Sequence, residues 1–356
     1  MECSTSTLSN KEYFQWFSNR LTALRVPLSG TLDITHRCNL RCVHCYIPAA
    51  QKNGMSEMDT GHLLSVIDDV TAAGCLDILI TGGEPLLRKD FPDIYRHIKL
   101  NGILVSVFTN GTLITDDVAA LFRELPPQSV EISVYGATAA TYEHITGIKD
   151  SFEKCLAGIT TLLEHNIAVR LKTILMTLNR HEFHAMENLA RSLGVKFRFD
   201  PAIFPCFDGD QSPLTLRVPP EDAVAFEFAD DDRSRDWKDF YAGYSDTSSL
   251  ETVYYCGAGV TDFYIDPNGI LQPCLMPTEL GFDLREGGFI EGWNMVIPRL
   301  MEKKPASDHV CRACSNRILC GYCPAFFRLE NNSEDAPSAY LCALGRSRFQ
   351  MIQEIP

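Results

Sequence analysis

Short apolar runs alternate with amphipathic stretches through most of the first 200 residues. The apolar runs have the length and composition of buried strands, and the stretches between them carry apolar residues at helical spacing. The predicted strands are 30–35, 76–80, 103–108, 129–134, 168–175 and 195–199, and the predicted helices are 59–74, 91–100, 116–125, 139–165 and 182–193. This alternation predicts parallel strands with right-handed crossovers. Six such units make a partial (β/α)₆ barrel, an α/β fold in which the loops after the strands carry the chemistry.

The segments outside this alternation have a different character. Residues 12–24 predict an amphipathic helix on the outside of the barrel. Between 201 and 250 the periodicity weakens, and prolines with an acidic run predict a linker over the barrel that contains one helix near 221–228. The expected domains are an N-terminal helix at 1–29, the barrel at 30–205, a bridging linker at 206–250, a cysteine-rich α+β domain at 251–345 and a tail at 346–356.

Composition narrows the class of protein. The chain has 356 residues, of which 45% are hydrophobic, enough for packed cores. No apolar run approaches the roughly 18 residues that span a bilayer, and the N-terminus does not resemble a signal peptide, so we expect a cytoplasmic protein with no membrane partner. The net charge of −14 is spread without a basic block, which argues against nucleic acid as a partner.

Cysteine is unusually frequent. The chain contains fourteen cysteines, and disulfides are disfavoured in a reducing compartment, so the clustered spacings indicate metal ligation. Ten of the cysteines fall into two groups. The remaining four, Cys3, Cys75, Cys155 and Cys206, stand alone.

The first group follows the first predicted strand. Cys38, Cys42 and Cys45 have the spacing CxxxCxxC. Three thiolates can bind three irons of a [4Fe–4S] cube and leave the fourth iron open. A structural zinc site needs a fourth nearby ligand, and the one candidate, His44, is wedged between two of the thiols. The spacing therefore favours an open, reactive cluster.

These residues resemble a known family. Cys38, Cys42 and Cys45 match the CxxxCxΦC signature of the radical S-adenosylmethionine (radical SAM) enzymes, with His44 at the aromatic position. The turn at residues 82–85, Gly-Gly-Glu-Pro, matches the second signature of that family. The resemblance implies that the open iron chelates the amino and carboxylate groups of SAM. An electron from the cluster then cleaves SAM to methionine and a 5′-deoxyadenosyl radical, which takes a hydrogen atom from the substrate.

The second group lies near the C-terminus and resembles the seven-cysteine SPASM extension of radical SAM enzymes. Its last gap has two residues where the usual pattern has three. By resemblance, one auxiliary [4Fe–4S] cluster would be held by Cys311, Cys314, Cys320 and Cys342, and another by Cys256, Cys274 and Cys323. The second set lacks a fourth thiolate, so its fourth ligand is either a different residue or the substrate. Two zinc sites are the competing interpretation.

The resemblance also implies contacts with SAM. Glu84 and the neighbouring backbone suit the SAM ammonium group, and Ser133 matches a serine that contacts the ribose or carboxylate. Tyr46 either lies near the adenine of SAM or has a packing role. Asn110 and Lys172 are weaker candidates for SAM contacts, and their alternative role is hydrogen bonding within loops. The predicted cofactor-binding residues are Tyr46, Gly82, Gly83, Glu84, Pro85, Asn110, Ser133 and Lys172.

Two residues are candidates for catalysis. Asp200 ends the sixth predicted strand, where it would orient substrate, accept a proton or cap the following turn. Cys206 lies a few residues further on and could donate a hydrogen atom to a substrate radical, although lone cysteines are more often inert packing residues.

Three functions compete. The leading hypothesis is a maturase of a ribosomally made peptide, in which hydrogen abstraction leads to a crosslink or side-chain oxidation. The first alternative is a radical SAM oxidoreductase or decarboxylase of a small molecule, and the second is a non-enzymatic iron–sulfur or zinc protein. The enzyme hypotheses imply a reducing partner such as ferredoxin or flavodoxin. The short N-terminus favours the small-molecule alternative, because many peptide maturases carry a leader-binding domain before the barrel and 29 residues cannot form one. A separate leader-peptide-binding protein is a further expected partner of a peptide maturase.

Overall fold

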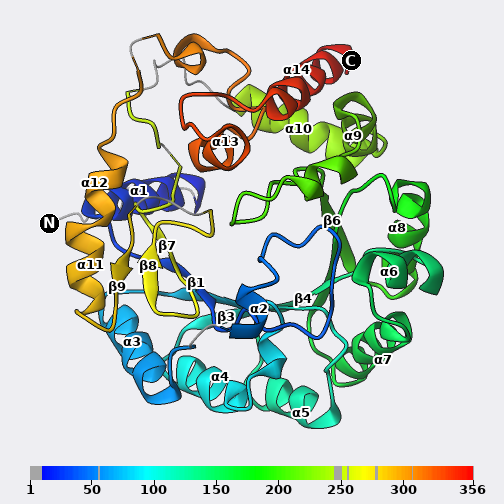
Figure 1. Cartoon of the computed structure of the whole chain (residues 1–356), viewed down its shortest axis with the longest axis vertical. Coiled ribbons are helices and arrows are strands. Elements are labelled where there is room, and N and C mark those ends of the chain that lie inside the picture. Colours follow the sequence, from blue (N-terminus) through cyan, green and yellow to red (C-terminus); the bar gives the residue numbers. More distant parts are fainter. Residues whose placement is uncertain are drawn as a thin grey trace, which may run out of the picture.

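Nine strands form one curved sheet around a central space, with helices on its outside (Figure 1). The computed structural model describes residues 10–54, 57–243, 251–254, 256–276, 280–306 and 308–355. Six parallel strands lie in the order β6-β5-β4-β3-β2-β1. They are β1 (Ser29–Asp33), β2 (Asp77–Thr81), β3 (Leu104–Thr109), β4 (Ser129–Ser133), β5 (Val169–Ile174) and β6 (Lys196–Asp200). The predicted six-stranded partial barrel is confirmed.

The helices between these strands form an arc outside the sheet (Figure 1). They are α3 (Thr60–Ala72), α4 (Phe91–Leu100), α5 (Asp116–Glu124), α6 (Ala139–Thr146), α7 (Ser151–Glu164) and α8 (Phe183–Ser192). The predicted helix 139–165 is in fact two helices, because Gly147 takes a left-handed conformation (φ 68°) that ends α6. Short helical turns lie at α2 (Gln51–Gly54), η1 (Pro85–Leu87), η2 (Arg180–Glu182), η3 (Ser212–Leu216) and η4 (Val310–Ala313).

The sheet continues across the expected domain boundary near residue 250. Strand β7 (Asp262–Ile265) pairs in parallel with β1, and a meander adds β8 (Ile270–Gln272) and β9 (Phe282–Asp283). The ring of Phe263 lies so close to Gly30 that a Cβ there would approach it to 2.2 Å. Phe263 and the buried Trp293 belong to the same core as the barrel. The C-terminal region thus covers what would otherwise be an open edge of β1.

The segment expected to be a linker contains two helices, α9 (Pro220–Glu227) and α10 (Asp231–Gly243). The first matches the predicted helix, and the second was not predicted. The acidic run starts α10, because the Asp230 carboxylate accepts hydrogen bonds from the backbone N–H groups of Asp232 and Arg233.

The C-terminal residues form helices rather than a tail. Beyond α11 (Phe289–Met295) and α12 (Ile297–Met301) come α13 (Pro324–Asn331) and α14 (Ala339–Glu354), which packs on α9. Arg348 of α14 makes a two-pronged ion pair with Glu227 of α9, at 2.7 and 2.6 Å. It also donates to the carbonyl of Leu319. This arginine therefore holds the cysteine-rich segment against the bridging helices.

The predicted N-terminal helix is present as α1 (Asn10–Leu24). Its described apolar side chains Trp16 and Leu24 are 52% and 63% exposed. The helix end is fixed by Arg25, which donates to the carbonyl of Gly259 and accepts a hydrogen bond from the indole of Trp293.

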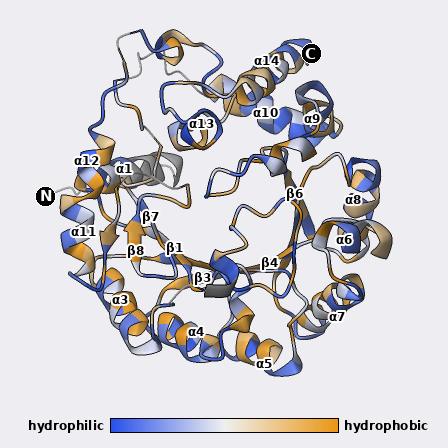
Figure 2. Ribbon diagram, viewed as in Figure 1, coloured by the Kyte–Doolittle hydropathy of each residue, from blue (hydrophilic) through white to orange (hydrophobic). Residues whose placement is uncertain are grey.

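Hydropathy follows the layers of the fold. Figure 2 shows apolar colours on the strands, whereas the surrounding helices mix apolar and polar residues. In the part of the chain that the structure describes, no helix has the length and apolar character needed to cross a membrane.

We expect Glu227→Gln to lower the apparent melting temperature by several degrees. The Arg348–Glu227 pair is only 10% and 7% exposed, and removing one partner of a buried pair leaves a charge uncompensated, at a cost of about 3 kcal/mol. The matched control is Glu124→Gln, because Glu124 pairs with Arg96 at 58% and 41% exposure and such surface pairs contribute little. Circular dichroism melts compare the two variants. Equal shifts would contradict a structural role for the buried pair.

Candidate functional site

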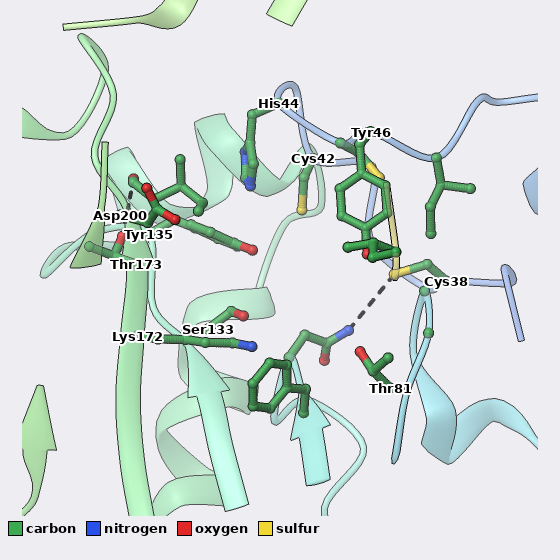
Figure 3. Close-up of a pocket in the computed structure, with 18 of the residues that line it drawn as sticks. Cys38, Cys42, His44, Tyr46, Thr81, Ser133, Tyr135, Lys172, Thr173 and Asp200 are labelled. Carbon is green, nitrogen blue, oxygen red and sulfur yellow. Dashed lines mark hydrogen bonds between the residues drawn. The ribbon is translucent and has the colours of Figure 1, made fainter. Parts of the chain in front are cut away.

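A cavity of about 420 Å³ opens at the carboxyl ends of the barrel strands. The thiol groups of Cys38, Cys42 and Cys45 line it together with residues from β2 to β6. In Figure 3, Cys38, Cys42 and His44 lie on one side of the cavity, and Lys172 and Ser133 lie across from them. The three thiols and the charged residues of the strands are far apart in the sequence. They nevertheless line the same cavity.

The loop that carries the three thiols is held by the end of α6. The backbone N–H groups of Arg41 and Val43 donate to the carbonyls of Thr146 and Ile145. Burial raises the pKa of Cys38 to about 11 and raises that of Cys42 further. Bound iron would supply the positive charge that keeps buried thiolates ionised.

The donor set fits an iron–sulfur cluster better than a single ion. Three thiolates are soft sulfur donors that can bind three irons of a four-iron cube, whereas a structural zinc site is closed by a fourth ligand.

The glycine turn after β2 packs directly on the segment that enters the cluster loop. Gly83 N–H donates to the Thr35 carbonyl at 2.6 Å, and Glu84 N–H donates to the Arg37 carbonyl at 2.8 Å. A Cβ on Gly82 would lie 2.4 Å from the Thr35 carbonyl oxygen, and one on Gly83 would lie 2.5 Å from that of Arg37. Only glycine fits between these backbones, and both glycines line the cavity.

Glu84 is not among the residues that line the cavity, and its predicted contact with SAM stays a prediction. It is fully buried, and it accepts hydrogen bonds from the Thr109 hydroxyl and from the N–H groups of Asn110 and Leu86. Burial raises its pKa to about 7, while these three donors favour the charged form. In this structure Glu84 ties the end of β3 to the glycine turn, and the adjacent Pro85 starts η1.

Three predicted SAM contacts lie in one row across the sheet. Ser133 of β4 is in register with Lys172 of β5, and Asn110 follows the end of β3. Asn110 donates to the Asn39 side chain at 2.9 Å and lies 4.0 Å from the Cys38 sulfur. All three line the cavity, and their proposed contacts with SAM stay predictions.

Tyr46 and the two catalytic candidates have different surroundings. The Tyr46 ring packs against both Phe204 and Phe207, which also stack on each other, and it lines the cavity. Asp200 lines the cavity and accepts a hydrogen bond from the N–H of Ala202, so it both faces the mouth and caps the next turn. Burial raises the pKa of Asp200. Cys206 is buried behind this wall, where its thiol donates to the Cys45 carbonyl at 3.2 Å.

Arg198 and Tyr135 are among the lining residues that sequence reasoning missed. Arg198 lies two positions before Asp200 on β6, so the period-two rule for strands could have placed both on one face. The Tyr135 ring meets His44 edge-on at 4.5 Å. Burial lowers the pKa of His44 to about 4, so its ring is neutral.

The C-terminal cysteines lie in two separate groups. Burial first, and then the thiolates of Cys342, Cys311 and Cys314, raise the pKa of Cys320 to about 12. In the other group, burial and then the charge of Cys323 raise the pKa of Cys274 to about 12. The division of these cysteines into four and three cluster ligands stays a prediction.

The three-cysteine group borders a cavity of its own, of about 220 Å³. Cys256, Cys274 and Cys323 line it together with Tyr254 and Arg317. Among the residues that the structure describes there, the lining contains no Asp, Glu or His. The lone cysteines Cys75 and Cys155 are buried, and Cys3 lies outside the described residues.

Comparison with known proteins gives consistent matches. The model of the radical SAM superfamily matches residues 32–193. AdoMet-dependent heme synthase of Methanosarcina barkeri is 26% identical over 326 residues, which cover 82% of this chain and 90% of that protein. Mycofactocin maturase MftC of Mycobacterium tuberculosis is 26% identical over 343 residues, covering 93% and 86%. Among solved structures, Streptococcus suis SuiB bound to its precursor peptide SuiA aligns with a TM-score of 0.71 at 13% identity, over 96% and 83% of the chains, and so shares the fold.

We expect Gly83→Ala to remove the iron bound at the Cys38 loop and to slow SAM cleavage on the order of 100-fold. The new Cβ meets two backbone carbonyl oxygens, of Arg37 at 2.5 Å and His36 at 2.6 Å, which cannot rotate away. The control is Gly243→Ala, because a Cβ on Gly243 meets nothing within 4 Å. Iron analysis and chromatography of 5′-deoxyadenosine measure the effects. Full iron content in Gly83→Ala would contradict this role.

Proposed function

The chain belongs to the radical SAM superfamily, and we propose that it modifies a ribosomally made peptide by hydrogen-atom abstraction. The observation that carries the proposal is the single cavity shared by three thiols, two glycines of the turn and the polar row of β4 and β5. Its volume of about 420 Å³ lies within the usual range of ligand sites.

The residues at the cavity have distinct roles in this proposal. Cys38, Cys42 and Cys45 hold a [4Fe–4S] cluster, and the backbone of Gly82 and Gly83 borders the space that SAM occupies beside it. When bound, the cluster and SAM supply a 5′-deoxyadenosyl radical that takes a hydrogen atom from the substrate. The chain's own contribution is to hold the ligands together, because the glycine turn and α6 both fix the cluster loop.

A peptide substrate is supported by the relatives. MftC is named a maturase, and SuiB was solved with a precursor peptide. Both align with more than nine tenths of this chain. The bond formed, whether a crosslink or a side-chain oxidation, follows the same initial hydrogen abstraction.

Two auxiliary clusters complete the proposal. Cys311, Cys314, Cys320 and Cys342 would ligate one fully, and the three-cysteine group would ligate the other. A reducing partner such as ferredoxin or flavodoxin and a separate leader-peptide-binding protein remain part of the prediction, as does a cytoplasmic location.

A small-molecule substrate is the second candidate. The match to AdoMet-dependent heme synthase supports this candidate, because the alignment covers 90% of that protein. The third hypothesis, a non-enzymatic iron–sulfur or zinc protein, is not retained, because the superfamily match runs from the end of β1 through α8 and so includes both the thiol loop and the glycine turn.

The test uses purified enzyme reconstituted with iron and sulfide and reduced anaerobically with SAM. We expect 5′-deoxyadenosine together with a mass change in a short peptide encoded beside the gene. SAM cleavage with every such peptide unchanged, and with a modified small molecule instead, would overturn the peptide proposal in favour of the second candidate.

A triple variant separates the two cysteine regions. Replacing Cys38, Cys42 and Cys45 with alanine should abolish SAM cleavage and leave the C-terminal iron in place. The wild-type enzyme should hold about twelve irons with three four-iron clusters, or about eight if the three-cysteine site is empty. Loss of all iron from the triple variant would contradict independent assembly of the two regions.

A further inference from the structure

A buried tyrosine of the C-terminal region reaches the end of β1. Tyr264 of β7 is in register with Thr31 of β1, which lines the main cavity. Asp33 lies two residues further along β1 and therefore on the same face of the sheet. The Tyr264 hydroxyl donates to Asp33 Oδ2 at 2.9 Å, and the two residues are only 3% and 2% exposed. This hydrogen bond is shielded from water, and it joins the C-terminal region to the strand that leads into the thiol loop.

Asp33 lies directly beside the glycine turn. A Cβ on Gly82 would be 3.2 Å from the second carboxyl oxygen, Asp33 Oδ1. This oxygen is buried, and no hydrogen bond from the described residues reaches it. His36, whose Nε2 lies 3.2 Å from Asp33 Oδ2, presents its backbone carbonyl to Gly83, where a Cβ would approach it to 2.6 Å. The side chain of Asp33 and the backbone of His36 thus flank the two glycines of the turn.

The Tyr264 hydroxyl fixes the direction of the Asp33 carboxyl group. Burial, and then the charge of Asp33, raise the pKa of Tyr264 well above its usual range, so the hydroxyl stays protonated and donates. A buried acceptor that loses its donor is left unsatisfied, which is costly. Without Tyr264 the carboxyl group would rotate toward the adjacent turn and compete for the Gly83 N–H, which now donates to the Thr35 carbonyl at 2.6 Å.

We propose that Tyr264 is a positioning residue for SAM cleavage, which acts through Asp33 to hold the glycine turn against the thiol loop. Tyr264 is not among the residues that line the main cavity, so its effect on SAM is indirect. It also lies outside residues 32–193, which the superfamily model matches. The inference goes beyond the proposed function, because it concerns SAM cleavage and holds for a peptide or a small-molecule substrate alike.

Two amides report the position of the turn. The N–H groups of Gly83 and Glu84 donate to the segment that enters the thiol loop, so their hydrogen exchange measures how often this contact opens. We expect Tyr264→Phe to speed exchange at both amides at least about tenfold in the reconstituted enzyme without SAM. Exchange at the buried Val105 and Val107 of β3 should stay unchanged, which checks that the fold is intact. Mass spectrometry with electron-transfer fragmentation resolves the individual amides.

The matched control removes a buried hydroxyl of the same kind. Tyr95 of α4 is fully buried, and its hydroxyl donates to the Leu125 carbonyl at 2.6 Å. Tyr95→Phe and Tyr264→Phe each delete one oxygen and one buried hydrogen bond, but only Tyr264 contacts Asp33. We expect Tyr95→Phe to leave exchange at the two turn amides unchanged, even where it lowers the melting temperature.

The kinetics of SAM cleavage separate positioning from general damage. Formation of 5′-deoxyadenosine by the reduced enzyme at increasing SAM, without substrate, gives KM and kcat. We expect Tyr264→Phe to raise the KM for SAM at least about tenfold and to leave kcat within about threefold, because the three thiols of the loop are untouched. Iron analysis should give the same content in the wild type, Tyr264→Phe and Tyr95→Phe.

A second variant removes the other partner of the hydrogen bond. Asp33→Leu replaces the carboxyl group with a side chain of similar size that accepts no hydrogen bond, and it should also speed exchange at the two turn amides. If both residues act through one hydrogen bond, their effects are not additive. The double variant Tyr264→Phe with Asp33→Leu should therefore exchange within about twofold of Asp33→Leu alone.

Each outcome decides for or against the positioning role. Unchanged exchange at the turn amides in Tyr264→Phe, equal acceleration in Tyr95→Phe, or additive effects in the double variant would overturn the proposal. A lower melting temperature with an unchanged KM for SAM would also overturn it, since the hydrogen bond would then be structural only. None of these measurements uses a peptide, so their failure is distinct from the failure of the peptide assay.

Discussion

The close approach of two backbones is the constraint on which this site depends. The glycine turn after β2 lies within hydrogen-bond distance of residues 35–37, which lead into the thiol loop after β1. No side chain larger than hydrogen fits at Gly82 or Gly83. Because β1 and β2 are paired neighbours, this contact fixes the thiols relative to the sheet, and Glu84 extends the same connection to β3.

The cysteine-rich region is joined to the barrel at two places. Strand β7 extends the sheet beside β1, so Phe263 shares the barrel's core. On the other side, Arg348 binds Glu227 and connects α14 to the bridging helices. The C-terminal cysteines therefore belong to a region that is packed on the barrel.

The distribution of charged residues differs between the whole chain and the cavity wall. The protein as a whole is acidic, yet the interior face of β5 and β6 is cationic where it meets the cavity. A low-dielectric wall strengthens such local fields, and it also makes an unpaired cation costly. Arg198 is compensated by two hydrogen bonds to Glu131, whereas burial and the neighbouring Arg198 charge lower the pKa of Lys172.

The local chemistry of the chain was predictable from its sequence. The spacing of Cys38, Cys42 and Cys45, the glycine turn and the strand–helix alternation each depend on neighbours within a few residues. Tertiary structure decided the rest. The pairing of β7 with β1 joins residues more than 200 positions apart, the register sets Lys172 beside Arg198, and Glu84 is buried in hydrogen bonds to the end of β3. Register and burial depend on how whole strands pack, and short-range spacing carries no information about which distant strand will be the neighbour.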